Sequence, residues 1–88
     1  MRFQVEWHTD ALEELAAIWL RAPDPEQVTM ACAQIDHDLS VHPLTIGGPV
    51  GSLLRSHVIV PVAVLYEVTQ STAQVTIVEI TEWRPEFN

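Results

Sequence analysis

Hydrophobic and polar residues alternate at the beginning of the chain. From Arg2 to Trp7 every second residue is large and apolar, and the residues between them are polar or charged. A period of two is typical of a β-strand with one buried face, because successive side chains point to opposite sides of the backbone. We therefore predict a first strand over residues 2–7.

A stretch with helical periodicity follows this strand. Asp10 and Glu13 have the spacing of a capping box, in which each side chain bonds a backbone N–H that the first helical turn leaves free. We predict that Asp10 is the N-cap and that the helix ends near Arg21, before Pro23. The core-facing residues are expected within one arc of this helix: Leu12, Leu15, Ala16, Ile18, Trp19 and Ala22.

The next segment repeats the start signal of a helix. Asp24 is expected as the N-cap, Pro25 occupies the first helical position, and Gln27 completes a second capping box. The apolar stripe of this helix is narrow and consists of Val28, Ala31, Cys32, Ile35 and Leu39. The pattern fades at Ser40, before His42-Pro43. Because the join at Ala22-Pro23 is short, we expect an antiparallel helical hairpin.

The second half of the chain indicates β-structure. Residues 42–52 hold all three glycines and two prolines and are predicted to form a long surface loop. Three segments rich in Val, Ile and Thr follow, over residues 53–60, 62–69 and 75–81, and are predicted to form an antiparallel meander. The predicted fold class is α+β: an N-terminal strand, an antiparallel helical hairpin and a three-stranded meander, β-α-α-β-β-β, in one domain over residues 1–88.

The middle strand of the meander predicts an uncovered surface. It is apolar on both faces, with Ala63 and Leu65 opposite to the main apolar row. A helical hairpin covers only one face of a sheet, so the second face needs another cover. This cover is either Trp83, Phe87 and the long loop, or a second copy of the chain, or a segment of a different protein. In the last case we expect Leu65, Trp83 and Phe87 to contact the partner.

Charge and composition narrow the function classes. Four arginines, no lysine and twelve carboxylates give a formal net charge of -8, which argues against general nucleic-acid binding because phosphate neutralisation needs clustered cations. The only cysteine, Cys32, excludes an internal disulfide. The four histidines lack metal-ligand spacing, so we expect no metal and no other cofactor. The longest apolar run, residues 58–66, is far below the roughly twenty residues of a membrane span, and we expect a cytoplasmic protein.

Candidate chemistry centres on Arg55. It shares a strand face with His57, and Tyr66 on the adjacent strand and Arg84 after the last strand can lie near it, depending on register. Arg, His and Tyr are the residue types that hold a phosphate and move a proton during RNA cleavage, so these four are the candidate catalytic residues. In the alternative, Arg55 pairs across the sheet with Glu67 or Glu79 and His57 is exposed.

The predicted elements, in this order, resemble the RelE/ParE family of bacterial toxins from type II toxin–antitoxin modules. The resemblance covers nearly the whole chain, in Phe3–Trp7, Ala11–Trp19, Ile35–Leu39 with Pro43, Gly48 ahead of Leu54-Arg55, Ala63–Val68 and Val75–Ile80. It implies a compact, growth-inhibiting toxin bound by an antitoxin, which lays a helix or strand over the open side of the sheet.

The resemblance implies one of two activities. Ribonuclease members of the family cleave messenger RNA on the ribosome, whereas ParE-like members inhibit DNA gyrase. Arg55 matches a strand arginine of the family, and Arg84 matches an arginine in the tail of some members. The chain departs from the ribonucleases at Ala63, where these often have a second sheet arginine, and in the tail Glu82–Phe87, which lacks their histidine and terminal tyrosine.

The leading expectation is therefore a toxin-family protein that acts through protein binding, with an antitoxin as partner and a gyrase-like protein as a candidate target. The enzymatic alternative is a ribosome-dependent endoribonuclease in which Arg55 and Arg84 hold the phosphate and His57 or Glu82 transfers the proton. A third alternative is a self-associating α+β module, a homodimer, without a toxin role. The sequence leaves open whether the chain is an enzyme.

Overall fold

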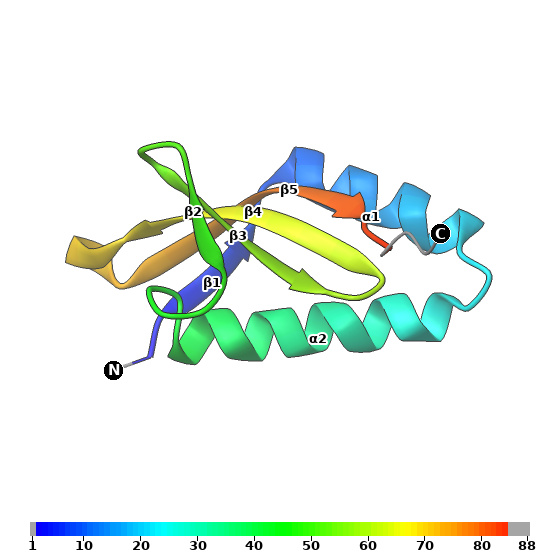
Figure 1. Cartoon of the computed structure of the whole chain (residues 1–88), viewed down its shortest axis with the longest axis horizontal. Helices are drawn as coiled ribbons and strands as arrows, with labels where there is room; N and C mark the ends of the chain where they lie inside the picture. The colour runs from blue at the N-terminus through cyan, green and yellow to red at the C-terminus, as the bar shows by residue number, and fades with distance from the viewer. Residues whose placement is uncertain (1, 85–88) are drawn as a thin grey trace.

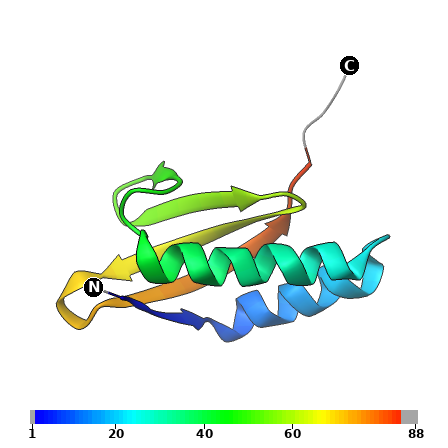
Figure 2. The ribbon, with the colours of Figure 1, turned by 90° about the horizontal axis from the view of Figure 1, so that it is seen from below.

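Two antiparallel helices lie on one side of a β-sheet (Figures 1 and 2). The computed structural model describes residues 2–84. In chain order the elements are β1 (Gln4–Trp7), α1 (Thr9–Arg21), α2 (Pro25–Val41), β2 (Gly48–Val50), β3 (Leu54–Ile59), β4 (Val62–Thr69), the short 3₁₀-helix η1 (Gln70–Thr72) and β5 (Gln74–Glu82). The predicted α+β order, the helical hairpin and the antiparallel meander are confirmed.

The first and last strands are neighbours in the sheet, whose order is β1-β5-β4-β3-β2. β1 runs parallel to β5, with Val5 opposite Val75, and all other neighbours are antiparallel. The pairing extends past the end of β1, because the His8 amide donates to the Ile77 carbonyl at 2.8 Å. The C-terminal strand β5 therefore holds the N-terminal strand β1 in the sheet. The helical hairpin, which connects β1 to β2, begins and ends at this same sheet.

The long loop predicted over residues 42–52 contains an additional short strand. β2 pairs with β3, with Gly48 opposite Ser56 and Val50 opposite Leu54. Its middle residue, Pro49, lacks an N–H and is tolerated here because β2 is an edge strand. The sequence prediction of a loop without a strand is therefore wrong at this position. A strand of only three residues with a central proline is too short to show the alternation of apolar and polar residues that predicts a strand.

The N-termini of both helices differ in detail from the predicted capping boxes. His8 is the N-cap of α1, and its Nδ1 accepts a hydrogen bond from the Asp10 amide at 3.1 Å. The prediction that Asp10 caps the helix is therefore wrong, because β1 ends so close to α1 that the helix already begins at Thr9. Asp24 is the N-cap of α2 as predicted, but its side chain makes no capping hydrogen bond.

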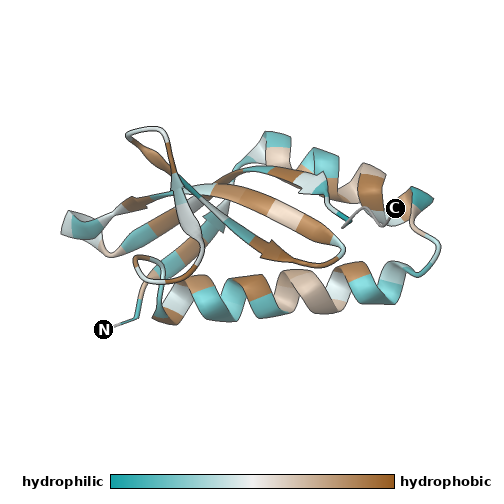
Figure 3. Ribbon diagram, in the orientation of Figure 1, coloured by the Kyte–Doolittle hydropathy of each residue, from teal (hydrophilic) through white to brown (hydrophobic). Residues whose placement is uncertain are grey.

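The core lies between the helices and the inner faces of β4 and β5. The predicted stripe of α2 is buried at every position, and so are three alternate residues of β4, Val62, Val64 and Tyr66. The prediction for α1 is only partly right: Ile18 is buried, but Leu12 and Trp19 are 49% and 45% exposed. The apolar arc of α1 is thus wider than the strip that the sheet and α2 cover. Figure 3 shows the hydrophobic middle of β4.

In the part of the chain that the structure describes, neither helix is long and apolar enough to cross a membrane.

Gly47, which immediately precedes β2, has a left-handed backbone conformation and lies very close to the backbone of β3. Its φ angle is +61°, and a Cβ added there would lie 1.8 Å from the Ser56 carbonyl oxygen on β3. A left-handed conformation costs an L-residue about 1–2 kcal/mol, and the clash with strand backbone cannot be relieved by rotating a side chain. Gly47 is therefore required for β2 to reach the edge of the sheet.

We predict that Gly47→Ala lowers the free energy of unfolding by about 2–4 kcal/mol, from the left-handed φ and the displacement of β3 together. The matched control is Gly48→Ala, where an added Cβ meets nothing within 4 Å. Urea denaturation followed by circular dichroism measures both variants. Similar losses in the two variants would contradict this role of Gly47.

Candidate functional site

The register between β3 and β4 brings three of the four candidate catalytic residues to the helix-facing side of the sheet. Arg55 lies opposite Tyr66, and His57 lies opposite Val64. Val64 and Tyr66 are buried in the core, so Arg55 and His57 on the same face point toward α2 and the segment that follows it. The shared strand face of Arg55 and His57 is as the sequence predicts.

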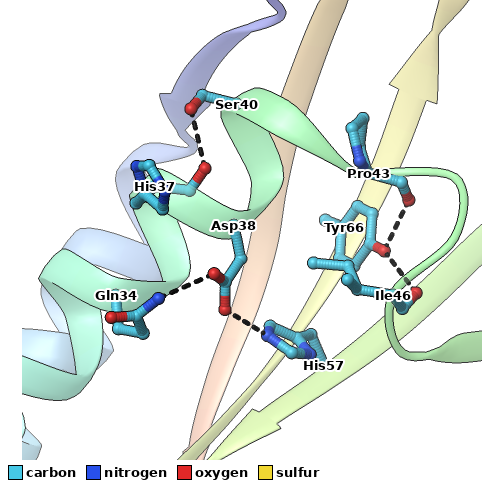
Figure 4. Close-up of polar contacts among 8 residues, drawn as sticks. All are labelled: Gln34, His37, Asp38, Ser40, Pro43, Ile46, His57 and Tyr66. Carbon is cyan, nitrogen blue, oxygen red and sulfur yellow. Dashed lines mark hydrogen bonds and ion pairs between the residues drawn. The ribbon is translucent and has the colours of Figure 1, made fainter.

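The Tyr66 hydroxyl is the centre of a buried polar cluster. It donates to the Pro43 carbonyl at 2.7 Å and lies 3.3 Å from the Ile46 carbonyl (Figure 4). Arg55 donates from Nε to the Tyr66 hydroxyl at 3.3 Å and from Nη2 to the Ile46 carbonyl at 2.9 Å. These bonds fasten the segment between α2 and β2 to the sheet, and they use two of the five N–H donors of the guanidinium group.

The alternative in which Arg55 pairs with Glu67 or Glu79 is wrong. Glu79 lies opposite Leu65, and Glu67 follows Tyr66, so both carboxylates belong to the other face of the sheet. Within residues 2–84, no carboxylate oxygen lies within 4.0 Å of the Arg55 guanidinium. Arg55 is therefore a half-buried cation whose bonded partners in this region are neutral oxygens.

His57 is paired with a carboxylate of α2 and is not exposed as that alternative expected. Its Nε2 lies 3.0 Å from Asp38 Oδ2, and the side chain retains only 13% of its exposure. Gln34 donates to the other oxygen of the carboxylate at 2.7 Å, as Figure 4 shows. Burial acts to raise the pKa of Asp38, but the hydrogen bonds from His57 and Gln34 and the charges of His57 and His37 outweigh it and lower the pKa.

The structure does not bring Arg84 to this cluster. Glu82, at the end of β5, lies opposite Val62, whereas Arg55 lies opposite Tyr66, four residues farther along β4. Four residues of strand span about 13 Å, and Arg84 lies beyond Glu82 in the exposed end of the described chain. Glu82, the alternative proton-transfer group, forms an ion pair with Arg21 of α1. The expected catalytic set is therefore split between two ends of the sheet.

The outer face of the sheet carries an apolar area that consists of Val58, Ala63 and Leu65. Leu65 lies between Ser56 and Glu79, and Ala63 lies between Val58 and Thr81. Both β4 residues are half-buried, so the apolar outer face predicted for β4 is present. Trp83 is 43% exposed, and its amide donates to the Pro61 carbonyl. Phe87, the remaining expected partner-binding residue, lies outside the described residues.

A second apolar surface, which the sequence did not predict, lies between α1 and α2. It is a groove of about 620 Å³, which we call the hairpin groove. The side chains that line it are Leu12, Leu15, Ala16, Trp19 and Leu20 from α1 and Val28, Thr29, Cys32, Ala33 and Asp36 from α2. Trp19 Nε1 donates to Thr29 Oγ1 at 3.1 Å and joins the two walls. The signal for this groove in the sequence is the width of the apolar arc on α1, all of which the sequence predicts to face the core.

Cys32 lines this groove but has the environment of a core residue. Burial, with a smaller contribution from the charge of Asp36, raises the pKa of its thiol to about 11. A thiol with so high a pKa is protonated at neutral pH and is a poor nucleophile. Cys32 therefore contributes to the apolar lining of the groove and is not expected to act there as a nucleophile.

We predict that Tyr66→Phe lowers the free energy of unfolding by about 1–3 kcal/mol, because the Pro43 carbonyl and Arg55 Nε each lose a buried partner. Ser40→Ala is the control, since the Ser40 hydroxyl bonds only a carbonyl of its own helix at an exposed position. Chemical denaturation measures both. A smaller loss for Tyr66→Phe than for Ser40→Ala would show that the cluster does not fasten the segment.

The Asp38 carboxylate gives stability a defined pH dependence. Its pKa in the folded protein lies below the ordinary value of 3.8, so its contribution is complete above that value and is lost as pH falls through the lowered pKa. We predict that Asp38→Asn destabilises the protein at pH 7 and that the difference from wild type shrinks toward pH 2. Denaturation at both pH values tests this, with Asp24→Asn as the matched variant. A difference that stays constant with pH would contradict the prediction.

Comparisons with known proteins were made by sequence and by structure. No protein-family model and no curated protein sequence matches the chain. The fold, however, is similar to that of solved structures. A chain of the RelBE2 toxin–antitoxin complex from Mycobacterium tuberculosis matches with a TM-score of 0.79 and 20% identity, covering 93% of this chain and 92% of the other.

Two further structures show the same likeness. A chain of the chromosomal ParDE toxin–antitoxin system from P. aeruginosa matches with a TM-score of 0.71 and 17% identity over 94% of this chain and 98% of the other. A chain of the archaeal RelE–RelB complex from Pyrococcus horikoshii OT3 matches with a TM-score of 0.68 and 14% identity over 93% and 96%. The β1-α1-α2-β2-β3-β4-β5 arrangement described above is therefore the fold of the RelE/ParE toxins.

Proposed function

We propose that this chain is the toxin-family component of a toxin–antitoxin module and that it acts by binding other proteins, first of all an antitoxin. Structures with the same fold were solved as RelBE2, ParDE and RelE–RelB assemblies, in which a toxin is paired with an antitoxin. Because these structures are at most 20% identical in sequence to this chain, their likeness establishes only the fold. The choice of protein binding as the activity depends on this chain's own surface and charges.

The observation that carries the proposal is the hairpin groove. Leu12, Trp19 and Leu20 expose 49%, 45% and 78% of their surfaces along one face of α1, and α2 supplies the opposite wall. Contiguous apolar surfaces of this kind mark protein-interaction sites in soluble proteins, since burying them against a partner removes apolar area from water. The apolar area of Val58, Ala63 and Leu65 on the outer face of the sheet offers a second contact region.

The polar residues support protein binding more than RNA cleavage. The Tyr66 hydroxyl is bonded to Pro43, His57 is paired with Asp38, and Glu82 is paired with Arg21. Each of these three candidate proton-transfer groups thus has a bonding partner within the protein. A net charge of -8 also repels the RNA backbone.

One observation favours the ribonuclease alternative. Arg55 has no carboxylate partner within residues 2–84 and lines a cavity of about 200 Å³ together with Leu44, Pro49 and Val68. Its remaining N–H donors could therefore meet a phosphate. Arg84 does not share this cavity, and a single arginine supplies little of the charge that RNA binding needs.

The proposal predicts a stable complex with the product of an adjacent short open reading frame. We expect growth inhibition when the chain is expressed alone, relief of this inhibition on co-expression, and co-purification of the two proteins. Purified protein added to translating ribosomes is expected to leave messenger RNA intact. A gyrase-like target is tested by measuring whether the purified protein inhibits DNA supercoiling by gyrase. A chain without a co-purifying partner and without an effect on growth would contradict the proposal.

The same ribosome assay distinguishes the enzymatic alternative. If wild-type protein cleaves messenger RNA, Arg55→Ala and Tyr66→Phe decide what Arg55 does, because both remove the bond between Arg55 and Tyr66 but only the first removes the cation. Cleavage lost in Arg55→Ala and retained in Tyr66→Phe would establish the ribonuclease. If neither the wild type nor the variants cleave messenger RNA, the result supports action through protein binding.

A further inference from the structure

We propose that the hairpin groove receives an amphipathic α-helix of the partner protein and that the flanks of this helix are rich in lysine and arginine. This inference rests on the proposed function, since it describes the segment of the partner that binds the groove. It goes further by specifying the conformation and the charge of that segment from the shape, the backbone and the carboxylates of the groove.

The shape of the groove fits a third helix. Leu12, Ala16, Trp19 and Leu20 lie on one face of α1, and the eight residue steps from Leu12 to Leu20 correspond to about 12 Å of helix. The small side chains of Ala16 and Ala33, one on each wall, allow close approach of another backbone. A helix laid between two antiparallel helices packs its side chains into the spaces between theirs. Apolar residues spaced by three, four and seven positions would fill this length.

The backbone of both walls favours a helical occupant over an extended one. Every residue that lines the groove belongs to α1 or α2, and most of their backbone amide and carbonyl groups are bonded within the helix. An extended peptide would find no strand edge there and would leave its own backbone groups without partners. A helix satisfies its backbone internally and brings only side chains to the apolar surface.

The charges around the groove are negative. Asp36 lines it and accepts a hydrogen bond from Trp7 Nε1 through Oδ1, which leaves Oδ2 for a partner. Glu13 lies two turns before Leu20 on α1, and Glu26 lies two turns before Ala33 on α2, so one exposed carboxylate stands at the margin of each wall. A partner with basic flanks meets these carboxylates with opposite charge.

No cation of the groove compensates these carboxylates. Among the described residues, the arginines are Arg2, Arg21, Arg55 and Arg84, and none of them lines the groove. Arg21 is paired with Glu82 of β5, and Arg55 belongs to the cluster around Tyr66. The chain also has no lysine. The groove therefore selects against acidic helices as well as favouring basic ones.

The same charges disfavour a second copy of this chain as the occupant. Each copy carries a formal net charge of -8. A symmetric dimer through the groove would place Glu13, Glu26 and Asp36 of one copy against the same residues of the other. Like charges at an interface weaken association, so a basic helix from a different protein is the favoured occupant.

Two synthetic peptides of about 18 residues test the charge and the location of the site, at a length that gives several helical turns. Both carry the same leucines at helical spacing, and the flanking positions are lysine in one and glutamate in the other. Binding to the whole protein is measured by fluorescence anisotropy of labelled peptide. We expect the lysine peptide to bind at least about tenfold more tightly than the glutamate peptide and to weaken as salt is raised.

Substitutions at two exposed leucines locate the binding. Leu20 is 78% exposed in the groove, and Leu53 is 80% exposed away from it, between β2 and β3. Leu20→Lys is expected to weaken the lysine peptide about tenfold or more, whereas Leu53→Lys leaves its affinity unchanged. Circular dichroism and urea denaturation verify that both variants fold. The double variant Glu13→Gln, Glu26→Gln is expected to reduce the preference for the lysine peptide.

Three results would overturn the inference: equal binding of the two peptides, equal effects of Leu20→Lys and Leu53→Lys, or self-association of the wild type that Leu20→Lys abolishes. The outcome is separable from that of the proposed function. If an antitoxin co-purifies but Leu20→Lys leaves its complex intact, the groove assignment fails and the proposed function stands. If the lysine peptide binds as expected but no antitoxin exists, the proposed function fails and the groove remains a site for basic helices.

Discussion

Burial of the inner face of β4 beneath the helical hairpin is the constraint on which the rest of the structure depends. β4 is the central strand, and Val62, Val64 and Tyr66 are all fully covered. Because side chains alternate along a strand, fixing these three residues also fixes the face of every residue paired with them on β3 and β5. Arg55 and His57 are thereby directed toward α2, whereas Glu79 is directed away from it. A slip of one residue would reverse each of these placements.

This placement explains how the candidate catalytic residues on β3 and β4 also help to hold the fold together. Tyr66 is buried, so its hydroxyl requires a partner, and the Pro43 carbonyl provides one. Arg55 completes the same cluster, and His57 bridges β3 to Asp38 on α2. The bonds hold the long connection after α2 against the sheet, where Gly47 then allows close contact with β3. Internal bonding thus provides partners for the Tyr66 hydroxyl and for His57, whereas it uses only two of the five N–H donors of Arg55.

The hairpin leaves part of its own apolar surface uncovered. α1 packs on β5 through Ala11 and Ile18, and the neighbouring row of Leu12, Ala16 and Trp19 turns outward beside α2. The acidic margins of this row give the surface a charge preference as well as an apolar one. The sheet and α2 together cover only part of the apolar arc of α1, so Leu12 and Trp19 remain about half exposed in the isolated chain.

The sequence by itself determined the order of elements, the complete buried stripe of α2 and the shared face of Arg55 and His57, because these follow from local periodicity. It could not decide the parallel pairing of β1 with β5, the short edge strand β2 at Pro49 or the His8 cap, since each depends on a neighbour distant in sequence or on where β1 ends. Only the tertiary structure separated Arg84 from Arg55 and showed that Leu12 and Trp19 line a groove. Periodicity shows which side of a helix is apolar, but the width that becomes buried depends on what packs against it.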